Sequence, residues 1–207
     1  MDSFEKSDIK KLLLCNTHLG TKTVENLMKN YVWKKRKDGI FIINISKTIK
    51  KLKIAARALA AVKDCSNILA ISTAECSQKA VLKFSSFIKC QVLTGKWISG
   101  KLTNHMCKKF QEPEIIIIAN PKIDYQPLLE ASRTNIPTIA FCNTDTPLKF
   151  IDVAIPGNNL DNHSIAFLWW MLTREVLIFR GQLSESKEWE TPVNMFLDSE
   201  ITNNKNT

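Results

Sequence analysis

The apolar and polar positions along the chain alternate between short apolar runs and longer repeats with helical spacing. Four consecutive isoleucines at 115–118 form the clearest run, and such β-branched runs are typical of a strand buried on both faces of a parallel sheet. Other short apolar runs predict strands at 68–71, 90–93, 138–142 and 153–155. Repeats with apolar residues three and four positions apart predict helices at 8–15, 46–62, 74–88, 127–132 and 162–180. This order of elements predicts an α/β fold with a doubly wound, mainly parallel sheet flanked by helices.

Two further extended segments, at 31–33 and 41–45, lie between the first two predicted helices. Asp38 and Gly39 separate them, and an Asp-Gly pair between extended segments is a strong signal for a tight turn. The sequence therefore predicts a hairpin near the N-terminus. Ser46 is the expected N-terminal cap of the helix that follows it.

Both ends of the chain differ from the part between them. The first residues are acidic where a signal peptide is basic, and the longest apolar run, at 165–172, falls short of the ~20 residues that span a bilayer. Periodicity is lost after about residue 184, which predicts one domain over 1–183 and a partly extended tail over 184–207, with its last residues disordered in isolation. The six cysteines form no C-x-x-C pair, so the sequence indicates a reduced chain inside the cell.

Charge is distributed unevenly along the sequence. The chain has 29 Lys/Arg and 20 Asp/Glu, a net charge of +9. Residues 1–110 hold 22 of the basic and 7 of the acidic residues, a net charge of +15, whereas residues 111–207 hold 7 and 13, a net charge of −6. Such asymmetry indicates that the N-terminal half faces a polyanion, either nucleic acid or an anionic membrane. A solvated basic surface without a partner is the alternative.

The densest basic cluster precedes the predicted hairpin turn, where four consecutive cations occupy 34–37. Tyr31 and Trp33 stand beside this charge, and aromatic side chains among cations suit RNA. Further lysines follow on the predicted helix at 46–62 and in a loop at 95–104. The expected RNA-binding residues are Lys22, Lys34, Lys35, Arg36, Lys37, Lys47, Lys50, Lys51, Lys53, Lys96 and Lys101.

The segment 95–101 matches G-x-x-x-x-G-K, the beginning of a phosphate-binding loop. The next residue must be Ser or Thr to supply a hydroxyl to magnesium, but it is Leu102, and Thr103 comes one position late. A basic loop that touches RNA phosphates accounts for Lys96 and Lys101 better than a nucleotide site does. Trp97 in this loop is either a base-stacking residue or part of the core.

Other catalytic or metal-binding patterns are missing from the sequence. The three histidines are scattered, and neither a G-x-G-x-x-G fingerprint nor a G-x-S-x-G elbow occurs. Asp145 and Asp152 resemble a carboxylate pair, but the sequence around Asp145 is more simply a polar turn. We therefore expect no catalytic residues, no metal and no cofactor.

Four segments carry a resemblance to a known family: T-H-L-G at 17–20, K-D-G-I-F-I-I-N at 37–44, N-I-P-T-I-A-F-C-N-T-D-T-P-L at 135–148, and W-W-M-L-T-R-E-V-L at 169–177. Together with shorter matches in the same order over about 8–198, they resemble the small-subunit ribosomal protein SA family. This family is also called laminin-receptor precursor and is the eukaryotic counterpart of bacterial ribosomal protein S-two.

The resemblance implies a flavodoxin-like α/β fold and a non-enzymatic structural role in the cytosolic small ribosomal subunit. It implies contacts with small-subunit ribosomal RNA and neighbouring ribosomal proteins, and roles in translation and in subunit assembly with RNA maturation. No membrane, small-molecule substrate or homo-oligomer in the ribosome is expected. A nucleotide-dependent enzyme and a membrane or extracellular receptor are the alternatives from other classes.

Three departures from the family pattern bear on these expectations. Asn16 stands where the family has glycine, which is a minor change. The inserted helical hairpin of bacterial members is missing, so the sequence resembles the archaeal and eukaryotic type. The long acidic C-terminal extension of animal members is also missing, which argues against the receptor roles assigned to it and indicates a reduced eukaryotic ribosome.

Overall fold

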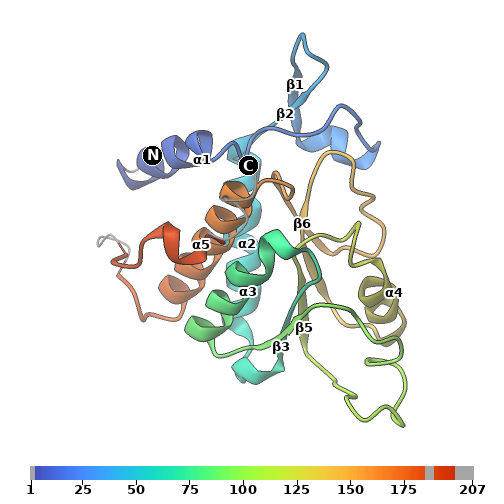
Figure 1. Cartoon of the computed structure of the whole chain (residues 1–207). Coiled ribbons are helices and arrows are strands. Elements are labelled where there is room, and N and C mark those ends of the chain that lie inside the picture. The colour runs from blue at the N-terminus through green and yellow to red at the C-terminus, as the bar shows by residue number, and fades with distance from the viewer. Residues whose placement is uncertain (1–2, 185–188, 199–207) are drawn as a thin grey trace, which may run out of the picture.

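The computed structural model describes residues 3–184 and 189–198, which fold around one parallel sheet (Figure 1). The five strands of this sheet are β3 (Ile68–Ser72), β4 (Gln91–Thr94), β5 (Ile115–Ile118), β6 (Thr138–Cys142) and β7 (Val153–Pro156). They lie in the order β4-β3-β5-β6-β7, and all neighbours are parallel. This is the flavodoxin-like order, with the first strand of the sheet between the second and the third. The predicted fold class is confirmed.

Helices cover the two faces of the sheet unequally (Figure 1). One face lies against α2 (Ile45–Ala61), α3 (Glu75–Ile88) and α5 (Asn162–Phe179), and the other against α4 (Tyr125–Thr134). The remaining helix, α1 (Ser3–Leu14), packs beside α5. Within the described residues, no helix is long and apolar enough to cross a membrane. The short 3-10 turns are η1 (Leu27–Tyr31), η2 (Cys65–Asn67) and η3 (Val193–Phe196).

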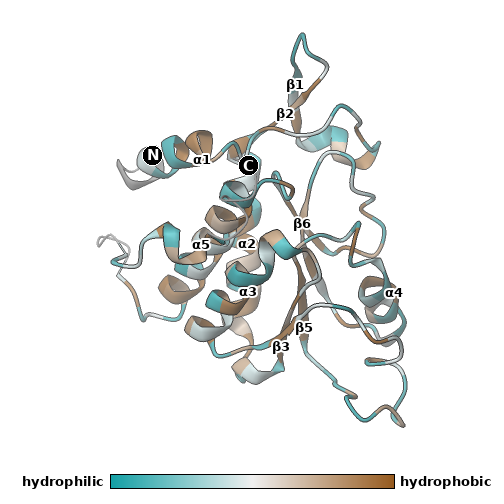
Figure 2. Cartoon of the chain, viewed as in Figure 1, coloured by the Kyte–Doolittle hydropathy of each residue, from teal (hydrophilic) through white to brown (hydrophobic). Residues whose placement is uncertain are grey.

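The isoleucine run in β5 shows how the sheet is buried on both faces. Ile115 and Ile117 belong to the core beneath the three helices, whereas Ile116 and Ile118 belong to the core on the α4 side. This alternation follows from the period of two along a strand. Figure 2 shows the apolar residues of β3 and β5 (brown) in the middle of the molecule. Trp169 of α5 is fully buried in the first core, with its ring centroid 4.8 Å from that of Phe84.

Loops complete the cover of the face on which α4 lies. Met28 of η1 and Leu102 of the loop after β4 are both buried there, together with Leu128 of α4. Trp97 and Leu148 pack partly buried against the same core. Because one helix cannot cover five strands, the apolar side chains of these loops bury the rest of this face.

The first hairpin forms a separate two-stranded antiparallel sheet of β1 (Val32–Lys35) and β2 (Phe41–Ile43), as the Asp-Gly turn predicted. The prediction that Ser46 caps the next helix is wrong. Asn44 has extended backbone angles, and its side-chain oxygen accepts a hydrogen bond from the Ser46 N–H at 3.1 Å, so the helix begins at Ile45. Asparagine suits this position because its short side chain reaches the unpaired N–H groups of the first turn.

The other predicted helices and strands are found within a few residues of their expected bounds. The largest differences are that α1 begins at Ser3 rather than at residue 8, and that α4 extends over Tyr125–Thr134 rather than 127–132. Caps and flanking turns decide such ends, and the apolar spacing used to predict these helices carries little information about them.

Part of the predicted C-terminal tail packs on the domain. Trp189 lies 5.1 Å from Phe87 and 5.6 Å from Trp170, measured between ring centroids. Phe196 is 1% exposed, and the Trp170 indole N–H donates to the Thr191 carbonyl at 2.9 Å. These contacts join residues 189–198 to α3 and α5. The expected disorder of the last residues lies outside the described residues.

A buried ion pair fastens α1 to α5. The Arg174 guanidinium donates two hydrogen bonds to the Asp8 carboxylate, at 2.9 and 2.6 Å, and a third to Glu175 at 3.2 Å. The side chain of Asp8 is 5% exposed and that of Arg174 is 14% exposed. Burial opposes the charge on Arg174, but its two carboxylate partners hold the pKa of the guanidinium above its usual value.

The ion pair predicts a large effect for Asp8→Ala. Removing this carboxylate leaves the Arg174 charge in a mostly buried place with Glu175 as its remaining acidic neighbour. We expect the free energy of unfolding, measured by urea denaturation, to fall by about 3 kcal/mol. The control is Asp38→Ala, which breaks the exposed Arg36–Asp38 pair and should cost less than about 1 kcal/mol. Equal effects of the two substitutions would contradict the assignment.

Candidate nucleic-acid interface

The β1–β2 hairpin projects away from the body of the protein (Figure 1). Its turn is closed by the Arg36 N–H, which donates to the Ile40 carbonyl at 2.8 Å, and by the Gly39 N–H, which donates to the Arg36 carbonyl at 3.0 Å. Gly39 has a φ of +85°, a conformation that glycine adopts without strain. The turn holds Asp38 beside Arg36, with 3.1 Å between the carboxylate and the guanidinium.

Most of the sequence-predicted cations on and below this hairpin face solvent. Lys51 and Lys53 are half-buried on α2. The exposed ones are Lys22, Lys34, Lys35, Arg36, Lys37, Lys47 and Lys50. The structure therefore brings the hairpin cations and the first turns of α2 together into one region, which we call the hairpin surface.

Aromatic rings and a carbonyl orient several of these lysines. The Lys35 ammonium lies 5.1 Å from the centroid of the Phe41 ring, and that of Lys51 lies 5.9 Å from the centroid of the Tyr31 ring. The Lys47 ammonium donates to the Asn30 carbonyl. Tyr31 is half-buried against the core on the α4 side, so it is part of the support of the hairpin surface.

The base of the hairpin is held by two distant segments. The Gly20 N–H donates to the Phe41 carbonyl at 2.8 Å, and the Phe41 N–H donates to the Thr21 carbonyl at 3.1 Å. The Thr144 hydroxyl, in the loop after β6, accepts from the Thr21 N–H at 2.9 Å. A Cβ at Gly20 would lie 2.4 Å from the Thr144 methyl group and 2.9 Å from the Phe41 carbonyl oxygen. Only glycine allows this approach, so 17–20 and 142–148 are parts of one support.

The loop that resembles a phosphate-binding loop already holds an anion of its own chain. The Glu130 carboxylate, from α4, accepts hydrogen bonds from the Gly100 N–H at 2.9 Å and the Leu102 N–H at 3.3 Å. It also accepts from the Trp97 indole N–H at 3.1 Å and the Gln126 amide at 3.0 Å. The backbone N–H groups of Gly100 and Leu102 are the ones that would face a phosphate in a nucleotide-binding loop.

Two other residues of this loop, Trp97 and Lys101, lie largely in the interior. Trp97 is half-buried against the core on the α4 side, so its ring packs in the interior. Lys101 is 5% exposed, with its ammonium 5.7 Å from the centroid of the Trp97 ring. Burial, together with the nearby charge of Lys109, lowers the pKa of Lys101. Lys101, one of the expected RNA-binding residues, therefore does not present its charge on the surface.

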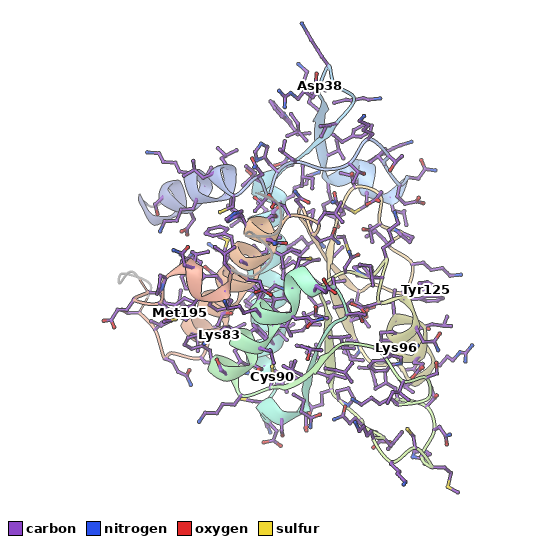
Figure 3. All side chains as sticks on the ribbon, viewed as in Figure 1. Asp38, Lys83, Cys90, Lys96, Tyr125 and Met195 are labelled. Carbon is purple, nitrogen blue, oxygen red and sulfur yellow. The ribbon has the colours of Figure 1, made fainter. Side chains whose placement is uncertain are left out.

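A second basic region lies around this loop and is well apart from the first. Lys96 is exposed, and so are Lys108 and Lys109, which were not among the predicted site residues. The phosphate-loop pattern drew attention to 95–101, while the plain pair of lysines after it carried no motif. Figure 3 shows Asp38 at the outer end of the hairpin and Lys96 beside α4 in the lower half of the molecule. The structure thus divides the predicted cations between two regions.

The similarity of this chain to known proteins extends over most of its length. The family model described as "Ribosomal protein S2" matches residues 12–111 and 105–177. A Drosophila persimilis protein named "Small ribosomal subunit protein uS2" is 44% identical over 94% of this chain and 72% of that protein. Proteins of the same name from Diaphorina citri and Ornithodoros parkeri are 41% and 44% identical over 94% and 91% of this chain, and 64% and 63% of those proteins. The matches include the hairpin and Glu130.

The internal carboxylate predicts a pH-dependent effect of Glu130→Gln. Burial alone would raise the pKa of Glu130, but its four hydrogen bonds outweigh burial and the pKa lies below its usual 4.5. A lowered pKa in the folded state gives stability that is present at neutral pH and is lost as the pH falls through the folded value. We expect Glu130→Gln to lower the free energy of unfolding by about 2 kcal/mol at neutral pH.

The difference between the parent protein and Glu130→Gln should shrink as the pH falls towards about 3, because protonated Glu130 also loses acceptor capacity. Urea denaturation at a series of pH values measures it. The matched control is Glu112→Gln, an exposed residue ten positions from Leu102, which should leave stability unchanged. A constant difference across the whole pH range would show that the carboxylate charge does not hold the loop.

Proposed function

This chain belongs to the ribosomal protein S2 family, and from this membership we propose that it is a structural constituent of the cytosolic small ribosomal subunit. In this proposal it binds small-subunit ribosomal RNA through the hairpin surface. It also contacts neighbouring ribosomal proteins, takes part in translation and contributes to subunit assembly and RNA maturation.

One observation carries the proposed RNA contact: four consecutive exposed cations on a hairpin that stands clear of the body. The hairpin holds one acidic residue, Asp38, which pairs with Arg36. Each phosphate that such cations neutralise releases condensed counterions, so affinity for RNA rises steeply as salt falls. Because the turn and the base of the hairpin are both fixed by hydrogen bonds, little chain entropy is lost when it binds.

The second basic region supports an additional, smaller contact. Lys96, Lys108 and Lys109 are exposed, but the region lies well apart from the hairpin surface, with Lys96 beside α4 and Asp38 at the outer end of the hairpin (Figure 3). An RNA that touched both regions would have to extend along the molecule. We propose that the two regions contact different segments of the ribosomal RNA, with the hairpin surface as the main one.

Two features support a role without catalysis. The nucleotide-like loop is filled by Glu130, as described above. In doubly wound folds, ligands bind beyond the carboxyl ends of the strands where the strand order reverses, here between β3 and β5. At that place Asp124 is 2% exposed, and its carboxylate accepts from both the hydroxyl and the N–H of Thr73. Burial raises the pKa of Asp124, although these hydrogen bonds oppose the rise. The amides of the loop thus bond the chain's own Glu130, and the carboxylate at the switch point is already bonded to Thr73.

The partners we propose besides RNA are proteins, and no second copy of this chain. The C-terminal half has a net charge of −6, so its exposed surface is suited to basic ribosomal proteins. No membrane or small-molecule substrate is part of the proposal.

The proposal predicts the behaviour of a charge-reversed hairpin. The triple variant Lys34→Glu, Lys35→Glu, Arg36→Glu should fold normally, because all three side chains are exposed. We expect its affinity for small-subunit ribosomal RNA to fall at least about tenfold, since three attractive phosphate contacts become repulsive. Sedimentation of cell extracts on sucrose gradients should then show the variant leaving the small-subunit fraction.

The matched control changes the net charge by the same amount elsewhere. Lys63→Glu, Lys79→Glu, Lys83→Glu lies beyond the end of α2 and on α3, away from the hairpin. This variant should stay with the small subunit. Equal incorporation of both triple variants would overturn the proposed role of the hairpin surface, and a parent protein found outside ribosomal fractions would overturn the proposed function as a whole.

A further inference from the structure

Trp33 is the extra residue of a bulge in the hairpin. Val32 pairs with Ile43 and Lys34 pairs with Ile42, so two adjacent positions on β2 oppose three on β1. The residue between the two pairs has no partner across the ladder. Bulges turn a side chain away from the regular face of a strand, and here the side chain turned outward is a tryptophan.

The exposure of Trp33 sets it apart from the other four tryptophans. Trp169 and Trp170 are buried, and Trp97 and Trp189 are half-buried in contact with the cores. Trp33 is 70% exposed, and among the described residues its ring makes no contact with another aromatic ring or with a cation. A large, flat, apolar surface is therefore presented to solvent at the point where the hairpin leaves the body.

The charge that surrounds this ring favours a ligand with both a flat face and negative groups. Trp33 is followed directly by Lys34, Lys35, Arg36 and Lys37. A nucleotide with an unpaired base supplies an aromatic face for the indole and phosphates for the cations. A base inside a duplex has both faces covered by its neighbours, and an apolar pocket on a protein supplies no phosphate.

We propose that Trp33 stacks on an unpaired base of the small-subunit ribosomal RNA while the neighbouring cations contact the adjacent phosphates. The inference rests on the proposed function, and it adds the kind of RNA that the hairpin recognises. The recognised element is a single strand, bulge or loop, and regular A-form duplex is recognised less well.

The experiment separates stacking from charge by their salt dependence. Binding of the full-length protein is measured by fluorescence anisotropy to labelled oligouridine of about twelve nucleotides, and to an RNA duplex of similar length, over a series of salt concentrations. Trp33→Ala should weaken binding to oligouridine about tenfold, a loss within the usual range for one stacked base, at every salt concentration. Its binding to the duplex and its salt slope should not change, and Trp33→Phe should retain most of the affinity.

Two comparison variants complete the design. Lys34→Ala, Lys35→Ala, Arg36→Ala should reduce the magnitude of the salt slope by about 2 on oligouridine and by about 3 on the duplex, since each phosphate contact contributes about 0.7 on single strands and about 0.9 on duplexes. Leu82→Ala removes another exposed apolar side chain, on α3, and should leave both RNAs bound as before. Oligouridine should also quench the part of the indole fluorescence that Trp33→Phe lacks, and the duplex should not.

The possible failures are distinguishable. If the parent protein binds both RNAs and Trp33→Ala binds oligouridine equally well, the stacking inference is overturned and the proposed function stands. An equal loss on oligouridine and duplex would also overturn it, since a duplex offers no free base. If Trp33→Ala binds oligouridine as the parent protein does but leaves the small-subunit fraction on a sucrose gradient, the stacking inference is overturned in favour of a protein neighbour of the ring. Absence of RNA binding by the parent protein would overturn the proposed RNA contact itself.

Discussion

The parallel sheet must be covered on both faces, and this constraint organises the rest of the molecule. Ile115–Ile118 place alternate side chains in two separate cores, so neither face can remain in water. Among the described residues, three helices cover one face and α4 alone lies on the other. Loops supply the missing cover there, through buried side chains such as Met28 and Leu102. The segments next to both basic regions are therefore fixed by the core, which is why exposed charges on them have defined positions.

The loop at 95–101 has the glycine spacing of a phosphate-binding loop because its backbone needs glycine, although it does not bind a nucleotide phosphate in the usual way. Gly95 and Gly100 have φ values of +94° and +88°, so the glycine spacing reflects turns that few other residues adopt. The turned backbone presents N–H groups to a common point, which an anion must occupy. In nucleotide-binding proteins that anion is a phosphate, whereas here it is Glu130, which comes from a helix of the same core. The pattern therefore identified a real anion-binding backbone and could not identify the anion.

Sequence patterns predicted the features that depend on residues close together in the chain, namely the helices, the strands and the hairpin turn. Apolar periodicity located the five strands of the sheet and its helices, and Asp38-Gly39 located the hairpin. The flavodoxin-like strand order came from a resemblance, because periodicity does not say which strands are neighbours. Burial of Lys101 and the docking of Phe196 were missed, since each depends on contacts between segments distant in the sequence. Of the candidate site, the exposed hairpin cations could be predicted from charge, but the carboxylate that fills the loop could not, because it comes from another element.

The position of the hairpin links the two halves of the chain that differ in charge. A two-stranded sheet is marginally stable alone, so the direction of the hairpin depends on what supports its base. That support is Thr144, in the acidic C-terminal half, which bonds the Thr21 N–H and lies against Gly20. A side chain at Gly20 would collide with Thr144 and with the Phe41 carbonyl oxygen, so the base of the hairpin would have to shift. The basic N-terminal half therefore supplies the cations, and Thr144 of the acidic C-terminal half supports the hairpin that carries them. The two halves differ in charge, but they are parts of one folded unit.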